Sequence, residues 1–105
     1  MDHKTVEEYI LSMPNAVLEY PFGEGVAVYK ANDKMFALIA EGKNPVNLSL
    51  KCAPELSEVL REKYVSVMPG YHLNKKHWNT LVLSDEMPWE EVQALINHSY
   101  QLVTG

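Results

Sequence analysis

Residues 26–51, VAVYKANDKMFALIAEGKNPVNLSLK, decide the predicted fold. Two mainly apolar runs, residues 26–30 and 35–41, flank the turn sequence ANDK, which predicts two strands joined by a tight turn. The next turn, GKNP, leads into residues 46–51, where apolar and polar side chains alternate strictly. Successive side chains of a strand point to opposite faces, so this alternation predicts an antiparallel sheet with one buried face and one polar face.

A helix is predicted before this segment. Apolar residues from Val6 onward recur at positions i, i+3, i+4 and i+7, which is the period of one helical face. Either Asp2 caps this helix, or a capping box of Thr5 and Glu8 starts it later. Pro14 disfavours helical backbone at the residue before it and therefore ends the helix.

The remaining elements complete a two-layer pattern. Residues 16–20 and 78–83 are expected to form strands, and residues 64–68 form a short apolar run. Pro54 suits the first turn of a second helix, and Pro88 that of a third. The resulting order, α-β(3–4)-α-β(1–2)-α, predicts a single α+β domain over residues 1–105. We expect a two-layer sandwich, an antiparallel sheet with the helices on one face.

Composition excludes several classes of function. The chain of 105 residues has a net charge of −5, which on average repels phosphate backbones and anionic membranes, and Arg61 is its one arginine. Cys52 is the one cysteine, so an intrachain disulfide is excluded. The charged N-terminus does not resemble a signal peptide, and the longest apolar stretch, MFALIA, is too short to span a bilayer. We expect a cytoplasmic protein, monomeric or weakly dimeric, with no cofactor and no membrane partner.

Residues 69–78, PGYHLNKKHW, form the most chemically distinctive segment. They lie in the interval between Glu62 and Asp85, which contains no acidic residue. Lysines beside aromatic residues are what a single-strand site uses, because the charge contacts phosphates and the rings stack on bases. The alternative is that the lysines are solvated and the aromatic residues belong to the core. Within the segment, Pro69-Gly70 is a turn dipeptide in which the glycine is expected to adopt a positive φ.

Seven residues of this segment are candidates for nucleic-acid contacts. Lys75, Lys76 and His77 would contact phosphates. His72 and Asn74 would make polar contacts, and the ring of Tyr71 or Trp78 would stack on bases. Three of them have a structural alternative, Trp78 as a core anchor and His72 or Asn74 as hydrogen-bond partners of the turn backbone.

Metal and catalytic chemistry have less support. His72 and His77 are spaced as H-x4-H, which matches no standard zinc pattern, and no cysteine pair or nearby carboxylate completes a site. Cys52 with a histidine would make a nucleophile–base pair, but a cysteine at the end of a strand is commonly a small buried side chain. We therefore assign no catalytic residue and no metal ligand from the sequence.

Several stretches together resemble the MmcQ/YjbR family of small bacterial proteins. They are YPFG (residues 20–23), KMFAL (34–38), VNLSLK (46–51), LRE (60–62), PGYHLNKKHW (69–78) and SY (99–100). The resemblance runs nearly end to end, and PGYHLNKKHW is its most specific string. It implies a compact α-β(3)-α-β(2)-α fold, similar to secretion-chaperone-like domains, and a DNA-binding function with which a double-wing arrangement is associated.

Three functional hypotheses follow, in order of preference. The first is a non-enzymatic DNA-binding protein of the MmcQ/YjbR type, which binds weakly and in a salt-dependent manner through the small basic and aromatic patch. The second is a protein-interaction module with a secretion-chaperone-like fold and no nucleic-acid binding. The third is an enzyme or small-ligand binder built around His72, His77 and Cys52.

Overall fold

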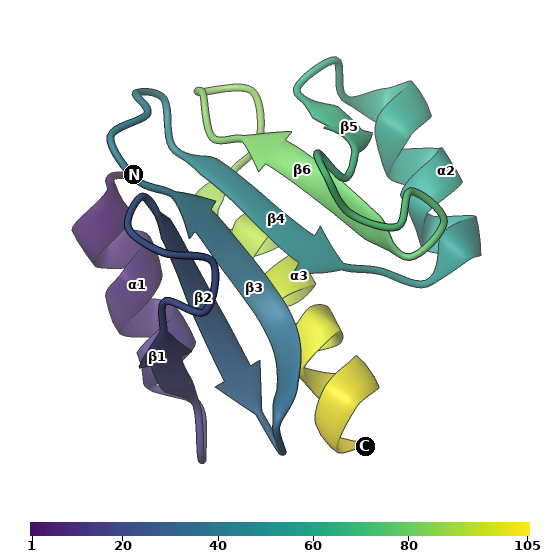
Figure 1. Ribbon diagram of the computed structural model, residues 1–105. Coiled ribbons are helices and arrows are strands. Elements are labelled where there is room, and N and C mark those ends of the chain that lie inside the picture. Colours follow the sequence, from purple (N-terminus) through teal and green to yellow (C-terminus); the bar gives the residue numbers. More distant parts are fainter.

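Six strands form one antiparallel sheet in the order β1-β2-β3-β4-β6-β5 (Figure 1). The computed structural model describes all residues from Met1 to Gly105. The strands are β1 (Val17–Glu19), β2 (Val26–Ala31), β3 (Lys34–Ala40), β4 (Asn47–Lys51), β5 (Val67–Pro69) and β6 (Trp78–Val82). The helices are α1 (His3–Leu11), α2 (Pro54–Lys63) and α3 (Trp89–Thr104). The predicted α+β class and order of elements are confirmed, with four strands before α2 and two after it.

Local sequence signals set the ends of these elements. Asp2 caps α1 by accepting a hydrogen bond from a backbone N–H of the first turn at 2.8 Å. Pro54 lies in the first turn of α2, and Pro88 directly precedes α3. Between β2 and β3, Asn32 and Asp33 have φ values of 53° and 62°. Two consecutive positive φ values give a hairpin turn whose twist matches that of the strands.

The main hydrophobic core lies between the three helices and one face of the sheet. In Figure 1, α3 crosses behind β3 and β4, α1 lies beside β1 and β2, and α2 lies at the β5–β6 end. The core contains 22 buried residues, among them Val6, Ile10, Tyr29, Phe36, Ile39, Leu48, Leu50, Leu81, Val92 and Ile96. The helices therefore share one face, as predicted. None of them has the length and apolar character needed to cross a membrane.

The face of the sheet opposite the helices, termed the open face below, is only partly polar. Asn47 and Ser49 of β4 lie on it, as the alternation predicts. Neighbouring strands place Val28, Leu38 and Trp78 on the same face as a second buried cluster. The face is less polar than the alternation of β4 predicts, because Val28 of β2 and Leu38 of β3 lie on it.

A buried hydroxyl joins the helix layer to the sheet. Ser99 of α3 donates to the Phe36 carbonyl oxygen at 2.6 Å and accepts the Lys51 backbone N–H at 2.9 Å. Phe36 is the extra residue of a bulge in β3, since its neighbours Met35 and Ala37 pair with Lys30 and Tyr29. Ser99 thus supplies hydrogen-bond partners at a point where the ladder leaves backbone groups unpaired.

We expect Ser99→Ala to lower the free energy of unfolding by about 2 kcal/mol, because it leaves two buried backbone groups unsatisfied. Urea denaturation followed by circular dichroism measures this. The matched control is Thr104→Ala, which removes a less buried hydroxyl of the same helix bonded to the Tyr100 carbonyl oxygen. The control is expected to cost about 0.5 kcal/mol. Equal losses in the two variants would contradict the bridging role of Ser99.

Candidate functional site

A cleft of about 650 Å³ lies on the open face. Its floor comes from β3, β4 and β6, with residues of β2 and β5 at the edges. Its walls come from the β1–β2 loop, the β3–β4 loop and residues 70–77, termed the β5–β6 loop. The lining residues are Phe22, Val26, Leu38, Ala40, Lys43, Asn47, Ser49, Met68, Pro69, Tyr71, His72, Leu73 and Thr80. Such a volume lies within the range of small-molecule sites, about 300–1,000 Å³.

The cleft combines exposed aromatic rings with positive charge. Phe22 on one wall is 63% exposed, and Tyr71 on the other is 71% exposed. Lys43 is also in the lining. None of the lining residues is acidic, although the chain contains 14 aspartate and glutamate residues. This lining favours an anionic ligand that carries aromatic groups.

Three polar side chains interrupt the otherwise apolar floor: Asn47, Ser49 and Thr80. The Ser49 and Thr80 hydroxyl oxygens are 2.8 Å apart across the β4–β6 pair and share one hydrogen bond. The Thr80 oxygen also accepts the Tyr71 backbone N–H at 3.0 Å. Thr80 therefore links the floor of the cleft to the wall that carries the Tyr71 ring.

The β5–β6 loop approaches the sheet closely at Gly70. A Cβ atom at Gly70 would lie 2.7 Å from the Trp78 Cβ, so no other residue fits there without a shift. The positive φ expected at Gly70 is wrong, because close packing rather than turn geometry requires the glycine. The positive φ of this loop belongs to His72, at 59°. With this uncommon backbone, the Tyr71 and His72 ring centroids lie 4.0 Å apart and both rings line the cleft.

Arg61 of α2 holds the loop from the helix side. Its Nε donates to Asn79 Oδ1 at 2.8 Å. One terminal nitrogen of its guanidinium donates to the carbonyl oxygens of Lys75 and Trp78. A planar guanidinium, with several donors in a rigid fork, suits such a set of acceptors. The one arginine of the chain is thus a structural clamp on both ends of the segment 75–79.

Three of the seven candidate residues have structural contacts. Asn74 Oδ1 accepts the backbone N–H groups of Lys76 and His77 at 2.9 and 3.3 Å and so folds the loop. Lys75 Nζ donates to a backbone carbonyl of the same loop at 3.0 Å. Trp78 is 7% exposed and belongs to the open-face cluster. The expectation that Trp78 offers a ring for stacking is therefore wrong, because its faces are covered.

The other four candidates are accessible. Tyr71 and His72 line the cleft, and Lys76 and His77 are exposed further along the same loop. The structure therefore separates side chains that hold the loop in shape from side chains that have no such contact, although Asn74 and Lys75 of the first group are exposed as well. Of the second group, Tyr71 and His72 line the cleft, whereas Lys76 and His77 do not.

Phe22, Lys43 and the polar floor were missed from the sequence. Phe22 reaches the cleft because its loop leads into β2, at one edge of the cleft floor. Strands β3 and β4 separate β2 from β6, which lies at the base of the opposite wall. The sequence YPFG contained a signal for Phe22, since an aromatic residue between proline and glycine in a turn has no local core to join. Nothing in the spacing of Lys43 or Ser49 marks them as neighbours of Tyr71.

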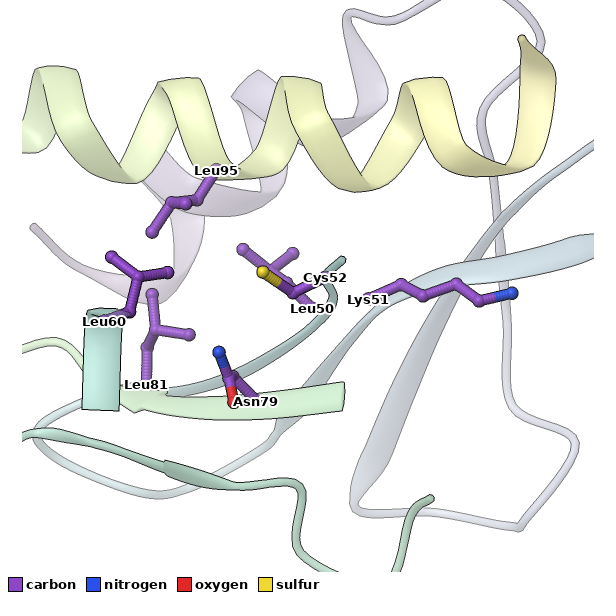
Figure 2. A pocket seen from close by; sticks show the side chains of 7 residues that line it. All are labelled: Leu50, Lys51, Cys52, Leu60, Asn79, Leu81 and Leu95. Carbon is purple, nitrogen blue, oxygen red and sulfur yellow. The ribbon is translucent and has the colours of Figure 1, made fainter. Parts of the chain in front are cut away.

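Cys52 lies on the helix side of the sheet, away from the cleft. It borders a void of about 10 Å³ together with Leu50, Lys51, Leu60, Asn79, Leu81 and Leu95 (Figure 2). Burial raises the pKa of the Cys52 thiol, and nearby Ser57 and Arg61 offset this only in part. A protonated buried thiol is a poor nucleophile. Of Cys52, His72 and His77, only Cys52 lines this void and only His72 lines the cleft, so the three do not share a pocket.

We expect Arg61→Met to increase amide hydrogen exchange in the β5–β6 loop at least about tenfold, because each lost charge-assisted hydrogen bond contributes about 1.5–3 kcal/mol. The amides to follow are those of Gly70, Tyr71 and His77, which are hydrogen-bonded within the clamped region. Exchange measured by NMR at single residues, with β2 and β3 amides as an internal reference for global unfolding, gives the readout.

Lys63→Met on the same helix is the control, since the Lys63 side chain is 60% exposed. Its exchange rates in the loop should equal those of the unmodified protein. The clamp role of Arg61 would be wrong if both variants left the loop amides equally protected.

Comparison with known proteins places this fold in a family. A family model described as YjbR matches residues 11–102. The protein YbdF of Escherichia coli O157:H7 is 36% identical over 101 residues, which cover 96% of this chain and 83% of YbdF. YjbR of Escherichia coli K12 is 35% identical over 94 residues, which cover 90% of this chain and 80% of YjbR. Both relatives carry names that state no ligand or activity.

Solved structures agree with this match. The crystal structure of Deinococcus radiodurans protein DR2400 superposes with a TM-score of 0.94 at 36% identity, covering 98% of this chain and 78% of that one. A crystal structure of a Pseudomonas syringae protein has a TM-score of 0.83 at 32% identity and covers 98% of this chain and 99% of its own. From the near-complete match in both sequence and fold, the chain belongs to the YjbR family.

Proposed function

We propose that this protein is a non-enzymatic DNA-binding module whose contact surface is the cleft and the exposed end of the β5–β6 loop. The composition of the cleft lining is the observation that supports the proposal most. Exposed rings and a lysine line the cleft, and no carboxylate does, in a chain whose net charge is −5. Exclusion of carboxylates from one concave surface of an acidic protein favours an anionic ligand at that surface.

Lys43, Lys76 and His77 are the proposed phosphate contacts. Lys43 lines the cleft, while Lys76 and His77 are exposed on the loop that forms its wall. Because these contacts are few, the dependence of log affinity on log salt should correspond to about 2–4 phosphates. Affinity should accordingly be weak, with a Kd of about 1–100 μM at physiological salt.

Tyr71, His72 and Phe22 are the proposed base contacts. All three rings line the cleft, and Tyr71 and Phe22 are among the most exposed large side chains of the protein. Stacking of a base on an aromatic side chain contributes about 1–3 kcal/mol and tolerates any base. Of the two residues that the sequence suggested for stacking, Tyr71 is kept, and Phe22 and His72 take the place of the buried Trp78.

A second candidate function, a protein-interaction module, is favoured by a different observation. Val65, between α2 and β5, is 93% exposed, and Val59 of α2 is exposed as well. A contiguous patch of exposed apolar side chains is typical of a protein-binding surface, and Val65 would be the centre of such a patch at the end of α2. A pull-down tests this function: it should recover a stoichiometric protein partner that remains bound after nuclease treatment. Val65→Ser, a substitution outside the cleft lining, should abolish that binding.

Fluorescence anisotropy with a labelled oligonucleotide, at about 50 and about 200 mM NaCl, tests the DNA-binding proposal. Lys76→Glu should weaken binding at the lower salt and reduce the salt slope by about 1, because one phosphate contact is lost. Lys4→Glu, on the exposed side of α1, is the matched control with the same change in net charge.

Two results would count against the proposal. Equal weakening by Lys76→Glu and Lys4→Glu would show that only overall charge matters and that the loop is not the contact surface. Absence of binding to any oligonucleotide at the lower salt would exclude DNA binding of the expected strength.

A further inference from the structure

The two hydroxyl groups on the cleft floor leave one donor unused. Ser49 and Thr80 each carry one hydroxyl proton, and a single hydrogen bond of 2.8 Å joins their oxygens. The third partner of this pair, the Tyr71 backbone N–H, is itself a donor to Thr80. Whichever hydroxyl donates to the other, one O–H proton therefore has no acceptor in the protein and is free for a ligand in the cleft.

The amide of Asn47 adds further hydrogen-bonding capacity beside this donor. Its Nδ2 donates to the Pro45 carbonyl oxygen at 3.4 Å, which leaves its second N–H and its Oδ1 without a partner in the protein. Asn47 and Ser49 lie on the same face of β4, two residues apart. The floor therefore presents donors and an acceptor side by side, surrounded by apolar side chains.

The walls place aromatic surface on both sides of this polar floor. Phe22 comes from the loop before β2, and Tyr71 and His72 come from the loop before β6. The floor between them is made by β3, β4 and β6, and spans two strand spacings, or about 10 Å. This geometry provides ring contacts for a flat heterocycle and hydrogen bonds for its polar edge.

We infer that the cleft takes one unpaired nucleobase, so that the protein binds single-stranded DNA in preference to duplex DNA. The inference rests on the proposed function and specifies its ligand. In a duplex, the ring faces are stacked and the Watson–Crick edges are paired, so a base cannot reach a recessed floor. An unpaired base has free faces and a free edge, so it can stack on the rings of one wall, either Tyr71 and His72 or Phe22, while its edge bonds to the floor. Lys43, in the lining, is placed for the adjoining phosphate.

Steric obstruction of the cleft tests the inference without changing charge. Ser49→Met fills the floor from β4, and Ala40→Met fills it from the neighbouring β3. Two variants on different strands keep the test valid if one of them does not fold, which circular dichroism and thermal unfolding establish. Val65→Met, at an exposed site outside the cleft, is the control for an added methionine.

Anisotropy titrations at low salt then compare one labelled oligonucleotide as a single strand and as a duplex, with dAMP as a free-nucleotide competitor. We expect the single strand to bind at least about tenfold more tightly than the duplex, and the cleft variants to lose about tenfold in single-strand affinity. Duplex binding and the Val65→Met control should not change, and dAMP should compete only at much higher concentration.

Each contrary outcome has a distinct meaning. Equal binding of single strand and duplex, both insensitive to Ser49→Met and Ala40→Met, would overturn base insertion while leaving DNA binding intact. Cleft-dependent binding of dAMP without binding of either oligonucleotide would assign the cleft to a free nucleotide and overturn the single-strand inference. Absence of all binding would overturn both the inference and the proposed function.

Discussion

The contacts of the Arg61 guanidinium are the constraint on which the cleft depends. They connect α2 to Asn79 in β6 and to the backbone at Lys75 and Trp78, the two sides of the point where the β5–β6 loop enters the strand. With that end held, Trp78 stays buried on the open face and the loop is held against the sheet. A side chain on the helix side of the sheet thereby determines the shape of a surface on the other side.

The β5–β6 loop is consequently part of the packed structure. Leu73 packs on the open-face cluster, Gly70 lies in contact with Trp78, and Thr80 holds the Tyr71 backbone. The left-handed backbone of His72 is maintained by these surroundings, since such a conformation is unfavourable for a residue with a Cβ. A binding surface that is held in place before the ligand arrives loses less conformational entropy on binding. This is the physical advantage of placing contact residues on a loop that also covers a hydrophobic cluster.

Features set by local chemistry were predictable from the sequence, and features set by the topology of the sheet were not. Asp2, Pro54 and the ANDK turn act on their immediate neighbours, so the helix starts and the β2–β3 hairpin follow from short-range rules. The cleft brings Phe22 together with Tyr71, and this proximity arises only when β2 and β6 are placed in one sheet. The burial of Trp78 likewise depends on Val28 and Leu38 of other strands, so composition alone grouped it with the accessible residues of its segment.

The central claim is that the cleft on the open face is the surface that binds DNA. Backbone amide chemical shifts of ¹⁵N-labelled protein, recorded during titration with a single-stranded oligonucleotide, test this claim most directly. The account predicts the largest changes at residues 47–49, 71–73 and 80, together with Lys76, and none along α1 and α3. Largest changes on the exposed sides of α1 and α3, with the cleft residues unaffected, would contradict it.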